Sequence, residues 1–181
     1  HNDTVADSPT DNFATWNPLA VSASTGTLSD GNLRVSTGTS GGGNVFSTFA
    51  IPNSGKYFCE ITAVDVVTYD LMVGISEYQV TSDNIWATTT NGVFYYEGNG
   101  NKYVNGSASA YGASYTNGDV IGIAVDADAD TITFYKNGVS QGAISHSVSG
   151  LFFALSDASG SGGSVAVANF GQQPFKYDPP A

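Results

Sequence analysis

KYVNGSASAYGASYTNGDVIGIAVDADADTITFYKNG, residues 102–138, is the stretch that decides the fold. It holds two apolar runs, Val120–Val125 and Thr131–Lys136, with the acidic segment Asp126–Asp130 between them. Side chains alternate between the two faces of a strand, so each run has one apolar face. The residues on these two faces are Ile121, Ile123, Val125, Ile132 and Phe134. The stretch therefore predicts an antiparallel hairpin packed on a core.

Similar short runs recur along the chain, separated by residues that favour turns. The predicted strands span residues 45–51, 56–64, 71–75, 92–96, 102–104, 151–155 and 165–170. Asn137-Gly138 ends the central hairpin, because Asn-Gly tolerates the positive φ of tight hairpin turns. No amphipathic helical window of real length is present. The pattern predicts an all-β protein, a two-sheet antiparallel sandwich with essentially no helix.

The same central stretch resembles the core of a SPRY domain. The shared motifs are Lys102-Tyr-x-Asn-Gly, Ala110-Tyr-Gly, Gly118-Asp-Val-Ile-Gly and Thr133-Phe-Tyr-Lys-Asn-Gly. Gly55–Glu60 resembles the opening strand of that family, and Asn169–Phe175 resembles its closing strand. The resemblance runs from Ser54 to Tyr177. It implies a bent sandwich of the jelly-roll, concanavalin A-like kind, which binds varied partners through loops at one end.

The first residues, 1–12, are polar and interrupted by proline, so we expect a linker there and one domain over residues 13–181. Residues 7–19 resemble the lead-in to SPRY-like modules in tail and appendage proteins of marine bacteriophages. Trp16 is expected to pack into the core or an interface. Asn2-Asp-Thr4 and Asn105-Gly-Ser107 fit the N-glycosylation pattern, which matters only in a eukaryotic host.

Composition narrows the partners and the setting. Charged residues make up 12% of the chain, against about 25% in ordinary globular proteins, and the net charge is −11. Such a field repels phosphate backbones, so we expect no nucleic-acid partner. No apolar run approaches the roughly 18 residues of a membrane span, so we expect no membrane insertion. The single cysteine, Cys59, is expected to be a buried small hydrophobe. The composition is typical of secreted or virion-surface β-proteins, which predicts an extracellular location.

The acidic segment offers the one pattern suggestive of a metal. Asp126, Asp128 and Asp130 alternate, and alternate carboxylates can converge on calcium. The segment lacks the glycine and the distal glutamate of an EF-hand loop, and aspartate is favoured in turns for its own sake. We therefore expect a structural turn and no cofactor, with calcium as the alternative.

Catalytic patterns are missing from the sequence. Glycoside hydrolysis needs two carboxylates across the scissile bond, and the three glutamates, Glu60, Glu77 and Glu97, form no such pattern. His146 is the only internal histidine, and no serine stands in a Gly-x-Ser-x-Gly motif. We expect a protein that is not an enzyme.

Aromatic residues supply the candidate ligand site. Trp86 stands in the polar segment 82–90, where no periodicity requires its burial. Several tyrosines follow within thirty residues, among Asn, Gly and Ser. Flat rings beside amide and hydroxyl groups suit the recognition of sugars and of protein surfaces. The predicted ligand-binding residues are Trp86, Tyr95, Tyr96, Asn99, Tyr103 and Tyr111. The SPRY resemblance offers the alternative that Tyr103 and Tyr111 pack the sandwich itself.

Three hypotheses of function follow. The leading one is a binding module of a phage tail fibre or similar appendage, which recognises cell-surface glycan or protein. The second is a self-assembling subunit of a fibre or coat, whose loops contact neighbouring copies. The third is a carbohydrate-binding module of a secreted bacterial enzyme.

Overall fold

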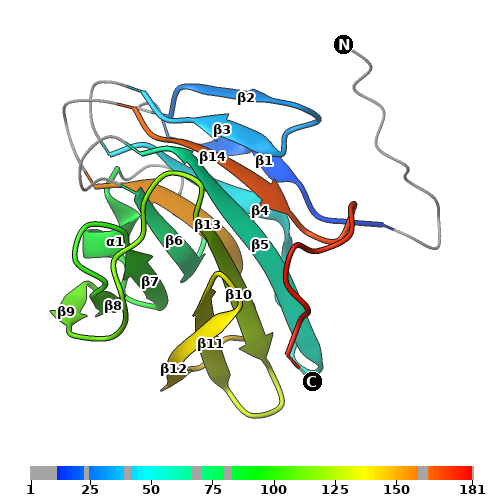
Figure 1. The fold of residues 1–181 in the computed structure, drawn as a ribbon. Helices are drawn as coiled ribbons and strands as arrows, with labels where there is room; N and C mark the ends of the chain where they lie inside the picture. Colours follow the sequence, from blue (N-terminus) through cyan, green and yellow to red (C-terminus); the bar gives the residue numbers. More distant parts are fainter. Residues whose placement is uncertain are drawn as a thin grey trace.

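The computed structural model describes residues 12–22, 25–38, 42–66, 71–79, 83–158 and 163–180. Within them the chain forms two seven-stranded sheets, and every paired strand is antiparallel. The sheets lie face to face, with β5, β10 and β14 in front of β4, β13 and β6 in Figure 1. The predicted two-sheet antiparallel sandwich is confirmed.

The first sheet has the strand order β1-β4-β13-β6-β7-β8-β9. Its strands are β1 (Trp16–Val21), β4 (Asn44–Ala50), β13 (Phe152–Asp157), β6 (Leu71–Ser76), β7 (Gly92–Tyr96), β8 (Lys102–Val104) and β9 (Ser107–Ser109). The second sheet has the order β12-β11-β10-β5-β14-β3-β2. Its strands are β12 (Val139–Ser145), β11 (Thr131–Lys136), β10 (Val120–Asp126), β5 (Lys56–Asp65), β14 (Val165–Asn169), β3 (Arg34–Ser36) and β2 (Thr27–Ser29).

The central hairpin forms with the predicted faces. β10 pairs with β11 so that Ile123 lies opposite Phe134 and Val125 lies opposite Ile132. All four side chains are buried in the core between the sheets. The alternation of apolar residues therefore sets the register, because a slip by one residue would turn both apolar faces to solvent.

Asn137-Gly138 makes the predicted tight turn from β11 to β12. Both residues have positive φ, 50° and 79°, and Lys136 pairs with Val139 across the turn. The Asn137 side chain also accepts a hydrogen bond from the Val120 N–H (2.9 Å) and donates one to Asp119 (2.6 Å). This turn thus joins three segments of the second sheet.

The N-terminal segment is anchored by its aromatic residues. Trp16 opens β1, is fully buried, and its ring packs edge-on against Phe170, with centroids 5.2 Å apart. Trp16 is therefore a core residue, as predicted. Residues 1–11 of the predicted linker lie outside the described residues.

One short helix, α1 (Ile85–Thr88), stands where the sequence indicated a loop. Figure 1 shows it beside β6 and β7. Its first residue, Ile85, is fully buried against the outer face of the first sheet. A helix of one turn is held by such an anchor rather than by its own propensity. The helix brings Trp86 onto that face.

Candidate functional site

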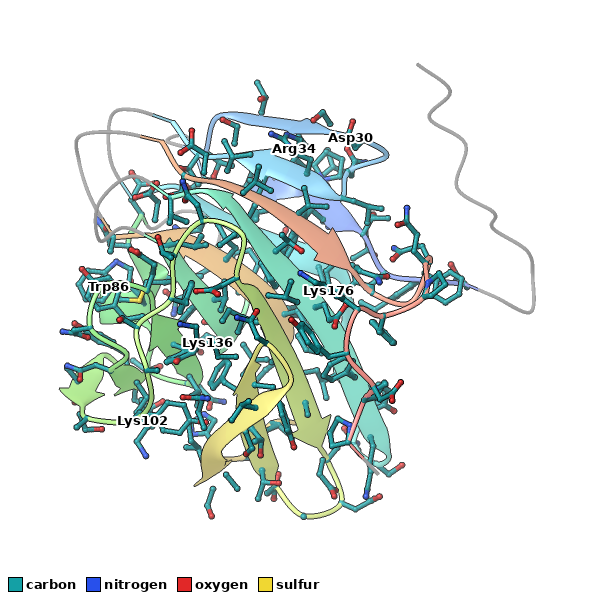
Figure 2. The ribbon with its side chains drawn as sticks, in the orientation of Figure 1. Asp30, Arg34, Trp86, Lys102, Lys136 and Lys176 are labelled. Carbon is teal, nitrogen blue, oxygen red and sulfur yellow. The ribbon has the colours of Figure 1, made fainter. Side chains whose placement is uncertain are left out.

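Three of the predicted ligand-binding side chains lie together on the outer face of the first sheet. Trp86 comes from α1, Tyr96 ends β7 and Tyr103 is the middle residue of β8. The Trp86 and Tyr103 ring centroids are 5.0 Å apart, and those of Tyr96 and Tyr103 are 6.0 Å apart, each pair at 85°. All three side chains are partly exposed, and Figure 2 shows Trp86 on the flank near α1. We call these three residues the aromatic corner.

The aromatic corner borders a second apolar cluster, separate from the core between the sheets. This cluster consists of Ala20, Phe46, Met72, Ile85, Phe94 and Ala154. Tyr103 lies opposite Phe94 in the pairing of β7 with β8, and Met72 lies opposite Tyr96 in the pairing of β6 with β7. The corner is therefore fixed on one side by packed residues while its other side remains accessible.

A buried polar contact holds α1 in place. The Asn44 Oδ1 atom accepts hydrogen bonds from the Ile85 N–H (3.3 Å) and from the Ser156 hydroxyl (2.6 Å). Asn44 and Ser156 are fully buried. The Trp86 Nε1–H donates to Asn84 Oδ1 at 3.3 Å, which orients the indole. The sequence carried no signal for Asn44 or Ser156, because single polar residues in strands are usually solvent-facing.

Tyr95 does not belong to a ligand site, which corrects the prediction. It follows Phe94 on β7, so it points to the opposite face, where it is fully buried. Its ring packs against Tyr115 and Phe134, with centroids 5.2 and 5.3 Å away. Its hydroxyl donates to the Ala113 carbonyl, and burial raises the pKa of Tyr95 to about 12. Tyr95 therefore fastens the chain around Ala113 to the core.

Tyr111 does not join the aromatic corner, although its side chain is partly exposed, and a contact between Tyr111 and a ligand stays a prediction. Its ring lies edge-on to Tyr95 at 5.5 Å and packs against the core. The Tyr111 hydroxyl donates to the Gly142 carbonyl and accepts from the Phe134 N–H at 3.2 Å. Burial raises the pKa of Tyr111 to about 12. The donor and the acceptor of this hydroxyl are thus both bound to backbone groups of the domain.

Asn99 lies in the turn that follows β7. The residue is exposed, and its Oδ1 atom accepts a hydrogen bond from the Asn101 N–H at 3.0 Å. This contact shapes the turn. A contact between Asn99 and a ligand stays a prediction.

The three aspartates of the acidic turn each contact different backbone groups. Asp126 Oδ1 accepts from the N–H groups of Asp128 (3.1 Å) and Ala129 (3.0 Å). Asp128 accepts from the Gly55 N–H (3.2 Å), and Asp130 accepts from the Val148 N–H (3.3 Å). Within the described ranges, no group of three or more His, Cys, Asp or Glu side chains lies close enough to hold a metal ion. This geometry supports a structural turn.

We predict that calcium is dispensable for folding. The carboxylates of Asp126, Asp128 and Asp130 already accept backbone hydrogen bonds. Adding EDTA should therefore leave the melting temperature measured by circular dichroism unchanged. A drop of several degrees, reversed by added calcium but not by magnesium, would show preferential binding of the ion to the native state and contradict this prediction.

Comparison with known proteins identifies the family. The sequence profile of the SPRY domain matches residues 60–173, more than half of the chain. The chain belongs to the SPRY domain family. A structural neighbour agrees: the SPRY domain of human HERC1 superposes with a TM-score of 0.76 at 24% identity, covering 88% of this chain and 99% of that domain. This likeness confirms the fold.

Relatives of this SPRY domain occur within larger proteins. A Ran-binding proteins 9/10 homolog of Drosophila melanogaster is 30% identical over 171 residues, which cover 90% of this chain and 18% of the fly protein. The E3 ubiquitin-protein ligase RKP of Arabidopsis thaliana is 43% identical over 76 residues, which cover 40% of this chain and 6% of that protein. The chain thus spans less than a fifth of the length of either relative.

SPRY domains are binding modules. The environment of the single cysteine in this chain agrees with that, because it does not produce a reactive thiol. Cys59 lies on β5 opposite Ile123, fully buried in the core, as predicted. Burial, followed by the nearby Glu60 charge, raises the pKa of the thiol well above its usual value. A protonated, inaccessible thiol is not a nucleophile.

No helix in the described part of this SPRY domain is long and apolar enough to cross a membrane.

Proposed function

We propose that this SPRY domain is a non-enzymatic recognition module whose aromatic corner binds a protein partner. The observation that supports it is the convergence of Trp86, Tyr96 and Tyr103 from α1, β7 and β8 on one exposed flank. Tryptophan and tyrosine are the residues that most often dominate binding energy at protein interfaces. Because the rings are fixed from beneath, little ordering entropy opposes binding.

The ring geometry favours a protein side chain over a sugar. A pyranose stacks on a flat, exposed aromatic face. At the aromatic corner the neighbouring rings stand at 85°, so that one ring presents its edge to the face of the next. An apolar side chain inserted between perpendicular rings contacts two faces at once. We therefore place a protein ligand ahead of the cell-surface glycan, which remains the second ligand class to test.

The decisive variant is Trp86→Ala. Peptides selected from a displayed random library against the purified domain, and glycans on an array, would supply the ligands. We expect selected peptides to lose at least about tenfold in affinity for the variant, the range of an interface hot spot. Fluorescence polarisation measures the loss. Tyr103→Ala should weaken binding in the same direction.

The control is Tyr78→Ala, which removes another exposed ring from the same sheet face. Tyr78 is 46% exposed, and its ring packs against Phe46 and Phe152 rather than against the aromatic corner. It should leave peptide affinity unchanged. Unaltered binding in both Trp86→Ala and Tyr103→Ala, with native melting temperatures, would move the ligand site elsewhere. Binding to glycans alone would replace the protein ligand with a sugar.

The setting of the domain is a further part of this proposal. Low charge and abundant Gly, Ser, Thr and Asn support a surface appendage, such as a phage tail fibre, outside the cell. The relatives described above are animal and plant proteins, so this setting rests on the sequence alone. Neighbouring genes for virion proteins would support it, and a host gene with further intracellular domains would overturn it.

A further inference from the structure

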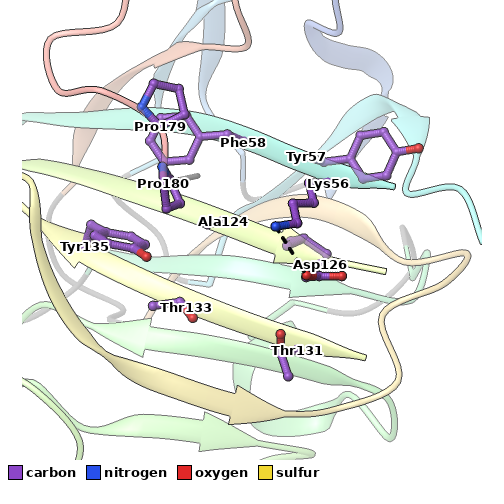
Figure 3. Close-up of a pocket in the computed structure, with 11 residues that line it drawn as sticks. Lys56, Tyr57, Phe58, Ala124, Asp126, Thr131, Thr133, Tyr135, Pro179 and Pro180 are labelled. Carbon is purple, nitrogen blue, oxygen red and sulfur yellow. Dashed lines mark ion pairs between the residues drawn. The ribbon is translucent and has the colours of Figure 1, made fainter. Parts of the chain in front are cut away.

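A groove runs over the outer face of the second sheet, on the opposite side of the sandwich from the aromatic corner. It has a volume of about 320 Å³ and is lined by residues of β5, β10, β11 and the C-terminal segment. Figure 3 shows Phe58 and Pro179 at one side, Tyr135 at another, and the Lys56–Asp126 ion pair beyond them. The proposed function does not use this groove.

The groove exists because the middle strand carries small residues. Across the three strands, Ala124 pairs with both Phe58 and Thr133, and Gly122 pairs with Tyr135. A Cβ atom on Gly122 would lie 2.9 Å from the Phe58 ring. Only glycine there allows the ring to lie over β10. The result is a shallow floor between two aromatic walls.

The C-terminal segment shows what chemistry this surface accepts. We call Phe175–Pro180 the C-terminal strap. Its Phe175 ring lies edge-on to Phe58, with centroids 4.9 Å apart, and its Pro179 and Pro180 line the groove. The protein therefore already seats a diproline beside Phe58 and Tyr135. Proline-rich segments bind aromatic-lined grooves because their extended conformation is preformed, so little entropy is lost.

The rest of the groove offers hydroxyl groups. Throughout the described ranges, the side chains of Thr131, Thr133 and Tyr135 form no hydrogen bond. A proline-rich segment lacks most backbone donors and presents carbonyl acceptors, which these hydroxyls can serve. Asp126 at the far end of the groove is already paired with Lys56, so the charge that favours a basic occupant is that of the exposed Asp178 before Pro179, together with the net charge of −11.

From these observations we propose that the groove binds a proline-rich, basic segment of a partner protein. The segment lies in an extended conformation between Phe58 and Tyr135, next to Pro179 and Pro180. Its prolines contact the two rings, its carbonyls accept from Thr133 and Tyr135, and a basic side chain reaches Asp178. The aromatic corner and the groove lie on opposite faces, so one domain can hold two partners at once.

The test uses the full chain and a fluorescein-labelled (Pro-Pro-Arg)3 peptide at about 0.15 M salt, where long-range attraction is screened. The charge-matched peptide (Ser-Ser-Arg)3 is the control ligand. We expect the proline peptide to bind and the serine peptide to bind at least about tenfold more weakly. Equal affinity for the two peptides, or no binding of the proline peptide, overturns the proposal.

Two variants locate the bound peptide. Ala124→Gln fills the floor and should lower affinity at least about tenfold. Tyr135→Phe removes one hydroxyl and should lower it by about two- to tenfold, the worth of a single hydrogen bond. Tyr78→Phe removes a hydroxyl on the other sheet and should change nothing. Circular dichroism and melting curves verify folding, and the conservative Tyr135→Phe keeps the test valid if Ala124→Gln unfolds.

The alternative occupant is a second copy of this chain. Analytical ultracentrifugation of the wild type and Ala124→Gln distinguishes the two. A monomer in both, with peptide binding only in the wild type, supports the partner segment. A dimer that Ala124→Gln dissociates would show that the groove binds a neighbouring copy, and unchanged peptide binding in Ala124→Gln would place the peptide outside the groove.

Discussion

Replacing Phe134 with alanine should lower the free energy of unfolding by about 3–5 kcal/mol. Phe134 is fully buried between the sheets and packs against Tyr95 at 5.3 Å and Tyr111 at 6.0 Å. Alanine would remove this apolar contact and leave a cavity that the rings cannot collapse into, because the Tyr95 and Tyr111 hydroxyls are bound to backbone carbonyls. Urea denaturation followed by tryptophan fluorescence measures the change.

The control is Thr133→Ala, one residue earlier on β11. Thr133 points to the outer face, so its replacement should cost about 1 kcal/mol or less, the span of strand propensities. The two residues are adjacent on β11 and point to opposite faces. A large difference between their costs in stability would therefore show that the face, and not the strand as a whole, determines the loss. A cost below about half a kcal/mol for Phe134→Ala, typical of surface sites, would contradict the assignment of the core face.

Replacing Glu60 with alanine should cost about 2–4 kcal/mol and release the C-terminal strap, because bonds to charged groups are strong and their loss leaves donors unpaired. Glu60 is only 4% exposed, on the outer face of β5. Its carboxylate accepts from the backbone N–H groups of Lys176 (2.8 Å) and Tyr177 (2.9 Å). Denaturation gives the cost. Faster amide hydrogen exchange at residues 176 and 177 would show that the strap has been released.

Glu60→Gln provides the matched control, since it keeps the shape and one acceptor oxygen. It should cost less than Glu60→Ala and leave one of the two strap amides protected. If Glu60→Ala left both amides as protected as in the wild type, the carboxylate would not be what holds the strap, and packing of Phe175 on Phe58 would be sufficient.

The sequence predicted the strands in which apolar residues alternate over several successive positions. β10 and β11 carry unbroken alternation, and both faces were assigned correctly. β12 escaped prediction because its residues are mostly polar and exposed, with only Ile144 buried. β1 escaped because it contains Pro18, which a sheet tolerates on an edge strand such as this one.

The candidate site was predicted in part for similar reasons. Tyr95 and Tyr96 are adjacent on a strand, so alternation already requires that only one of them faces a given ligand. The sequence did not show whether Tyr95 or Tyr96 is the exposed one, because the residues on either side of the pair, Phe94 and Glu97, do not decide which face of the strand is buried. Trp86 meets Tyr103 only because the chain after β6 crosses the outer face of the sheet. That path depends on the buried contact of Ile85 with Asn44, which has no local sequence pattern.

The strand order also determines when this protein can fold during its synthesis. β13 lies between β4 and β6, and β14 lies between β5 and β3, although both are made last. The first sheet cannot be completed until the ribosome has released β13, which ends at Asp157, and the second cannot be completed until it has released β14, which ends at Asn169. Until then the apolar strands β4, β5 and β6 of the nascent chain each lack one final partner, and such non-local pairing folds slowly. Folding of this domain is therefore expected to be completed only after translation of its last strand.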